Sequence, residues 1–101
     1  MKLAEGVFFK HLGAGKWEAW IESYYGLDWV ITCEAKGMMT EHELMIDVIE
    51  TRPGYREMKH AQHMLEAFRA AIPLTVVPIG ILPEAQGFWD KMKERGLVKY
   101  E

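Results

Sequence analysis

The segment Arg52–Arg56, with the sequence Arg-Pro-Gly-Tyr-Arg, carries the clearest sign of chemistry in this chain. It follows a β-rich apolar segment and precedes one with helical periodicity, so it should lead a strand into a helix. A helix N-terminus has unpaired N–H groups and about half a positive charge. Arg56 adds a full charge beside it. This combination predicts an anion site, such as one for a phosphate, although Arg56 as an ordinary surface charge is the alternative.

Three carboxylates lie on or beside the strand before this turn, namely Glu43, Asp47 and Glu50. Regular alternation along a strand places Glu43 and Asp47 on one side and Glu50 on the other. A carboxylate can act as a general base when it reaches a substrate proton and has a suitable pKa. Asp47 is the most unusual of the three, because it stands inside an apolar strand. The alternative for each is an acid that faces solvent.

Two histidines, His60 and His63, are three residues apart on the expected helix. This spacing can ligate a metal, but no third ligand or signature accompanies it, so we expect no metal site. The single cysteine, Cys33, cannot form an internal disulfide, which is typical of a reducing compartment. We expect it to be a small buried residue of a strand.

The elements that position these residues are best defined in the second half of the chain. Apolar residues repeat at helical spacing between Ala61 and Ile72, and Pro73 ends that pattern. Two strands joined by one helix through short connections must run parallel. The predicted order is strand Leu44–Thr51, helix Gly54–Ile72, strand Leu74–Ile81 and helix Pro83–Arg95, with a closing strand over Leu97–Tyr100.

The first half is less regular, with strands predicted over residues 6–12 and Leu27–Ala35, the latter ending at Lys36-Gly37. Residues 16–25 fit both a helix and a strand by their apolar spacing. The loop Gly13-Ala14-Gly15 between aromatic segments favours a hairpin, and hence a strand. Hairpins followed by a βαβ unit predict an α/β fold, an α+β mixed sheet in a single domain over residues 1–101.

Composition sets the class of protein. The chain has 101 residues, half of them apolar, and a net charge of −3, which argues against a nucleic-acid or membrane partner. Without a long apolar segment or a signal-peptide core at the N-terminus, a cytoplasmic location is expected. Met38-Met39 and the aromatic residues within 17–29 predict an exposed apolar patch for a homodimer or protein partner. Core packing is the alternative.

The order of elements and residues from Glu43 to Met92 resembles the GNAT (general N-acetyltransferase) superfamily. In that family an Arg/Gln-x-x-Gly-x-Gly/Ala motif opens the helix, and its backbone amides hold the pyrophosphate of acetyl-CoA. Matching positions here are Tyr55, Arg56 and Ala61 at the first helix, and Ala85, Phe88, Lys91 and Met92 in the last one. The resemblance implies antiparallel N-terminal strands followed by a β-α-β-α unit with two splayed parallel strands.

The resemblance also implies a ligand and its contacts. The cofactor would be acetyl-CoA or another acyl-CoA, and the acceptor an unknown amine. Asp47 or Glu43 would be the catalytic base. The residues expected to bind the cofactor are Ile49, Glu50 and Thr51 on the strand, Arg56, Glu57, Met58, Lys59, His60 and Ala61 at the turn, and Trp89 on the last helix.

Three positions depart from the family pattern. Lys59 stands in place of the first glycine of the phosphate loop, Leu82 in place of an asparagine, and Trp89 in place of the tyrosine that often acts as general acid. An indole cannot serve as an acid. The usual N-terminal helices have no counterpart here. The alternative is therefore a catalytically inactive GNAT-like protein that acts through protein contacts, like the short proteins carried by small genomes such as those of tailed phages.

Overall fold

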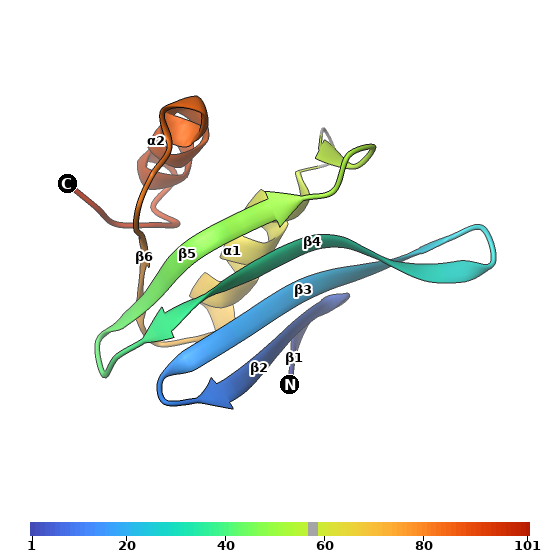
Figure 1. Ribbon diagram of the computed structural model, residues 1–101, viewed down its shortest axis with the longest axis horizontal. Coiled ribbons are helices and arrows are strands. Elements are labelled where there is room, and N and C mark those ends of the chain that lie inside the picture. Colours follow the sequence, from blue (N-terminus) through green and yellow to red (C-terminus); the bar gives the residue numbers. More distant parts are fainter. Residues whose placement is uncertain (57–58) are drawn as a thin grey trace.

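The computed structural model describes residues 1–56 and 59–101 (Figure 1). Within these residues six strands form one mixed sheet in the order β1-β2-β3-β4-β5-β6. The strands are β1 (Lys2–Ala4), β2 (Val7–Gly13), β3 (Lys16–Tyr25), β4 (Asp28–Met39), β5 (Glu43–Thr51) and β6 (Thr75–Pro78). The helices are α1 (His60–Ala71), the short 3-10 turn η2 (Pro83–Ala85) and α2 (Gln86–Glu94).

Strands β1 to β5 form an antiparallel meander, and β6 pairs parallel to β5. Helix α1 makes the connection between the two parallel strands, as such a pair requires. The predicted mixed α+β sheet with a parallel pair is therefore confirmed. Residues 16–25 form β3, which pairs with both β2 and β4, so the strand interpretation is the correct one.

The core lies between α1 and the face of the sheet that α1 covers, which is the far face in Figure 1. Phe9 and Trp17 stack with ring centroids 5.4 Å apart, and Phe68 of α1 meets both rings edge-on. Cys33 is fully buried in β4, as predicted. The described part of the chain places no helix over the opposite face of the sheet (Figure 1).

A β-bulge interrupts the pairing of β4 with β5. Gly37 pairs with Ile46 and Lys36 with Val48, which leaves Asp47 as the extra residue. A Cβ atom on Gly37 would lie 1.8 Å from the carbonyl oxygen of Met45, so only glycine fits there. The prediction that Lys36-Gly37 ends the strand is wrong, because this glycine accommodates the bulge inside β4.

The buried indole of Trp17 holds the bulge from the core side. Its Nε1–H donates to the carbonyl oxygens of Met38 at 3.1 Å and Met45 at 3.2 Å. Leaving these carbonyls unpaired in the interior would cost free energy. The bulge is thus a fixed feature of the fold.

The bulge also reverses the expected orientation of Glu50. Leu44 and Ile46 are buried toward α1 before the bulge, whereas Ile49 and Thr51 are the half-buried residues after it. Glu50 therefore faces away from α1, on the same side as Glu43. The prediction that Glu50 lies opposite Glu43 is wrong because one inserted residue shifts the alternation.

Several element boundaries differ from the prediction. Helix α1 begins at His60 rather than Gly54, because Gly54 and Lys59 have left-handed φ angles of 95° and 58° that a helix cannot include. The last helix begins as η2 before α2, and β6 covers only Thr75–Pro78 of the predicted strand. Residues 97–100 form no strand; Lys99 donates a single backbone hydrogen bond to Val76.

The predicted apolar patch is divided between core and surface. Trp17 is buried, and Met38 and Met39 are half-buried in β4. The tip of the long β3–β4 hairpin is different: Leu27 and Trp29 are 90% and 65% exposed. The exposed members of the predicted patch thus belong to the tip of this hairpin, whose place in the fold is seen in Figure 1.

Candidate functional site

A cleft of about 630 Å³ lies between the second half of β5, the start of α1 and helix α2. Its walls come from three separate segments of the chain. They are Ile49, Glu50 and Thr51 on β5, Arg56 and Lys59–Gln62 at the start of α1, and Glu84, Ala85, Phe88, Trp89, Lys91, Met92 and Arg95 on the α2 side.

The cleft brings together the residues predicted to bind a cofactor. Of these, Ile49, Glu50, Thr51, Arg56, Lys59, His60, Ala61 and Trp89 all line it. Glu57 and Met58 lie outside the described residues. The two predicted catalytic carboxylates do not line the cleft: Asp47 is exposed at the bulge, and Glu43 is half-buried at the start of β5.

The cleft is open because β6 leaves β5 early. The last residue pair is Ile46 with Pro78, and the last backbone hydrogen bond runs from Ile79 N–H to Ile46 at 3.0 Å. Pro78 has no N–H group with which to continue a ladder. Strand β5 itself continues to Thr51. Its second half therefore forms one wall of the cleft, with no strand beside it on that side among the described residues.

The backbone of β5 offers hydrogen bonds to this cleft. Arg52 N–H donates to Thr32 on β4 at 2.8 Å, so by alternation Glu50 also directs its backbone groups toward β4. Ile49 and Thr51 then direct theirs toward the cleft. Thr51 carbonyl accepts from Arg56 Nε at 3.2 Å. The backbone of Ile49 can pair with an extended ligand in the way that a strand is added to a sheet.

The turn into α1 has an unusual conformation at Lys59. Its φ and ψ are 58° and 30°, in the left-handed region, and it is the residue directly before the helix. A side chain in this region costs about 1–2 kcal/mol, and such strain often marks functional sites. Among the described residues, the N-cap residue Lys59 makes no side-chain capping hydrogen bond, and the first turn of α1 contains no acidic residue. Within residues 1–56 and 59–101, the N–H groups of this turn are thus available to an anion.

Charges in the cleft favour an anion as well. Among the described lining residues, Arg56, Lys59, Lys91 and Arg95 supply four positive charges, against two negative charges from Glu50 and Glu84. The whole chain by contrast carries −3.

Four polar residues that line the cleft were not predicted as site residues: Gln62, Glu84, Lys91 and Arg95. Arg95 Nη1 donates to Gln62 Oε1, which links the end of α2 to the first turn of α1. The sequence holds one sign of them: Lys91 and Arg95 are four residues apart, a spacing that places both on one face of a helix. The contact of Arg95 with Gln62 depends on tertiary packing.

His60 occupies the first turn of α1 beside the sheet. Its Nδ1 lies 3.4 Å from Thr32 Oγ1, and Nε2 is buried without a hydrogen-bond partner in the part of the chain that the structure describes. Burial, together with the nearby charge of His63, lowers the pKa of His60 below its usual value. Burial thus favours the neutral form of the ring.

Comparison with protein-family models, curated proteins and solved structures finds no match to this chain. Across residues 1–56 and 59–101, no helix has the length and apolar character needed to cross a bilayer. The same residues contain no group of three or more His, Cys, Asp or Glu side chains able to hold a metal ion. Support for a function therefore comes from the cleft itself.

Proposed function

We propose that this protein is a GNAT-like domain that binds acetyl-CoA or another acyl-CoA in the cleft and transfers the acyl group to an amine. One observation carries the proposal: among the described residues, a helix N-terminus with no side-chain cap from Lys59 and a strand edge with no partner border the same cleft, whose described side chains carry an excess of positive charge. The helix N-terminus suits a pyrophosphate, and the strand edge suits an extended arm with amide groups.

The ligand would lie along β5. Its pyrophosphate would take the N–H groups at the start of α1, with Arg56 and Lys59 as counter-charges. Its pantetheine arm would follow the backbone of Thr51 and Ile49 toward the bulge at Asp47. The distance along the strand from Thr51 to Asp47 is about 13 Å, because a strand rises about 3.3 Å per residue. The thioester would then approach the exposed carboxylate of Asp47.

The chemistry is direct acyl transfer. The amine nitrogen attacks the thioester carbon, so the C–N bond forms and the C–S bond breaks as the thiolate leaves. The amine proton passes to a carboxylate, for which we propose Asp47, with Glu43 as the second candidate. The thiolate takes a proton from water, because Trp89 has no acidic group to offer.

A second candidate function is binding without turnover. Trp89 is only 6% exposed, and Leu82, in place of the expected asparagine, is 59% exposed. Neither side chain can donate or accept a proton at the thioester. On this alternative the cleft holds an acyl-CoA, and the protein acts through contacts with another protein.

Calorimetry with acetyl-CoA tests the binding. We expect Arg56→Ala to weaken it by about 1.5–3 kcal/mol, the usual contribution of a charged hydrogen bond. Arg52→Ala is a matched control, because that guanidinium pairs with Glu34 on the other face of the sheet. Absence of heat and of a thermal shift at millimolar ligand would refute the proposal, as would equal affinities of the Arg56 variant and the wild type.

Release of free thiol from acetyl-CoA in the presence of amines separates the two candidate functions. Transfer predicts thiol release that Asp47→Asn abolishes while the affinity for acetyl-CoA is kept. Binding with no thiol release across primary amines would instead support the alternative.

A further inference from the structure

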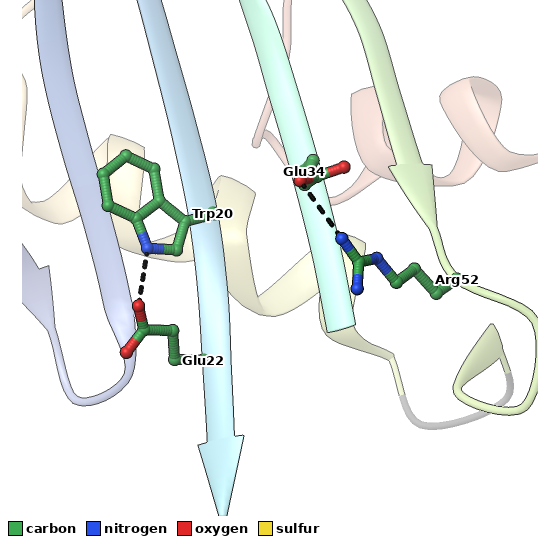
Figure 2. A network of polar contacts seen from close by, with 4 residues as sticks. All are labelled: Trp20, Glu22, Glu34 and Arg52. Carbon is green, nitrogen blue, oxygen red and sulfur yellow. Dashed lines mark hydrogen bonds and ion pairs between the residues drawn. The ribbon is translucent and has the colours of Figure 1, made fainter. Parts of the chain in front are cut away.

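A second hollow, of about 530 Å³, lies on the sheet face that α1 does not cover. Figure 2 shows four side chains of this face, which come from β3, β4 and the end of β5. Trp20 provides an aromatic surface: it stacks on Phe8, with centroids 5.8 Å apart and an interplanar angle of 19°. Ile31 and Val48 add further apolar area.

Two carboxylates face each other across the hollow. Glu34 and Glu50 are directly paired on β4 and β5, and Glu34 is also the cross-strand neighbour of Trp20. Like charges in this arrangement destabilise a sheet. Arg52 lies 3.5 Å from Glu34, but both side chains are about half exposed, so the pair is weak (Figure 2). Glu50 has no ion pair within the described residues.

The hollow and the cleft meet at one residue. Glu50 lines both of them, since β5 alone separates the two. A group in the hollow is therefore one strand away from a ligand that lies along the other side of β5.

We propose that the uncovered sheet face docks a polypeptide segment and receives a lysine side chain between Glu34 and Glu50. The aliphatic part of the lysine lies along Trp20 and Val48, and its ammonium group relieves the repulsion between the carboxylates. The proposal goes beyond the acyl transfer proposed above and does not depend on it, because the docked ammonium group lies one strand away from the cleft and is not the acceptor amine.

The shape of the face favours a polypeptide over a small amine. Small-molecule sites bury most of their ligand. This hollow is open and continues into the uncovered face, where Phe8 and Trp20 are only half-buried. A peptide can contact that wider surface while a single lysine fills the hollow.

The test is a titration of the ¹⁵N-labelled protein, without CoA, followed by NMR. The probe is a nine-residue Gly/Ser/Ala peptide with one central lysine, and its control carries norleucine instead. We expect the lysine peptide to shift the Trp20 indole and Glu50 amide signals and the norleucine peptide to leave them in place. The double variant Glu34→Gln/Glu50→Gln should weaken binding by about tenfold or more.

A control double variant, Glu41→Gln/Glu101→Gln, makes the same charge change at exposed sites away from the hollow. It should bind like the wild type. Equal shifts with both peptides, an unaffected Glu34/Glu50 variant, or binding of 1,4-diaminobutane as tight as that of the peptide would each overturn the proposal. Because like charges are removed, the Glu34/Glu50 variant should melt no lower than the wild type, so a loss of binding is not a loss of folding.

The calorimetric test of acyl-CoA binding is independent of this titration. Peptide binding in a protein that takes no acyl-CoA supports the docking face and refutes the transfer. Acyl-CoA binding in a protein that takes no lysine peptide supports the acyl-CoA site and refutes the docking face.

Discussion

Replacement of Lys59 by glycine separates backbone strain from charge at the start of α1. The residue has φ 58° and its side chain is exposed, so the change removes no core contact. Release of left-handed strain favours glycine by about 1–2 kcal/mol. The greater flexibility of glycine in the unfolded chain offsets about 0.5–1 kcal/mol of that gain. Lys59→Gly should therefore stabilise the fold by about 0.5–1 kcal/mol.

Lys59→Ala is the matched control, because alanine removes the ammonium group but keeps the Cβ atom and the strain. Urea unfolding followed by tryptophan fluorescence measures both variants, and a gain of about 1 kcal/mol raises the melting temperature by about 4–8 °C in a domain of this size. The alanine variant should unfold like the wild type. Glycine and alanine variants of equal stability would refute the strained conformation of Lys59.

The same pair of variants separates two roles of Lys59 in binding. If the ammonium group pairs with the pyrophosphate, both variants lose affinity for acetyl-CoA. If the Cβ atom instead crowds the ligand, only the glycine variant gains affinity. The pairing role is our expectation, because Lys59 lines a cleft with an excess of positive charge.

Two further predictions concern the bulge and the buried histidine. Gly37→Ala should lower the free energy of unfolding in urea by about 2–3 kcal/mol, because its Cβ atom would lie 1.8 Å from the carbonyl oxygen of Met45. The control is Gly87→Ala on α2, where a Cβ atom meets nothing within 4 Å, and this change should stabilise the fold. Similar effects of the two variants would contradict the bulge. The lowered pKa of His60 means that its contribution to stability is complete above the unfolded pKa of 6.5 and is lost as pH falls from there through the folded value. Between pH 7.5 and 5.5 the urea midpoint should thus fall more for the wild type than for His60→Gln, and parallel pH profiles would show that His60 does not titrate in this way.

Residues 16–25 show where local pattern reaches its limit. The apolar spacing of Trp17, Trp20, Ile21 and Tyr24 fits a helix, and the alternation of Trp17, Ala19 and Ile21 fits a strand. Pairing with β2 on one side and β4 on the other decides for the strand, because a central strand satisfies its backbone hydrogen bonds on both edges. That partner information is absent from the segment itself.

The start of α1 shows a second limit. The pattern from Ala61 onward predicts the helix correctly, but it puts the beginning at Gly54, six residues before His60. The left-handed backbone at Lys59 prevents the helix from beginning before His60. The residue type gives no sign of this, because lysine has no preference for that conformation. A glycine at this position would indicate a left-handed backbone, because glycine adopts that conformation readily.

The sequence by itself determined the order of elements from Glu43 to Met92, the parallel pair and the residues at the turn, because hydrophobic periodicity and proline positions are local properties. Only the tertiary structure decided which residues share a site. The bulge at Asp47 sets the face of Glu50, and the early end of β6 opens β5 to a ligand. Both features depend on contacts between distant segments, such as Trp17 with Met45, that no local pattern contains.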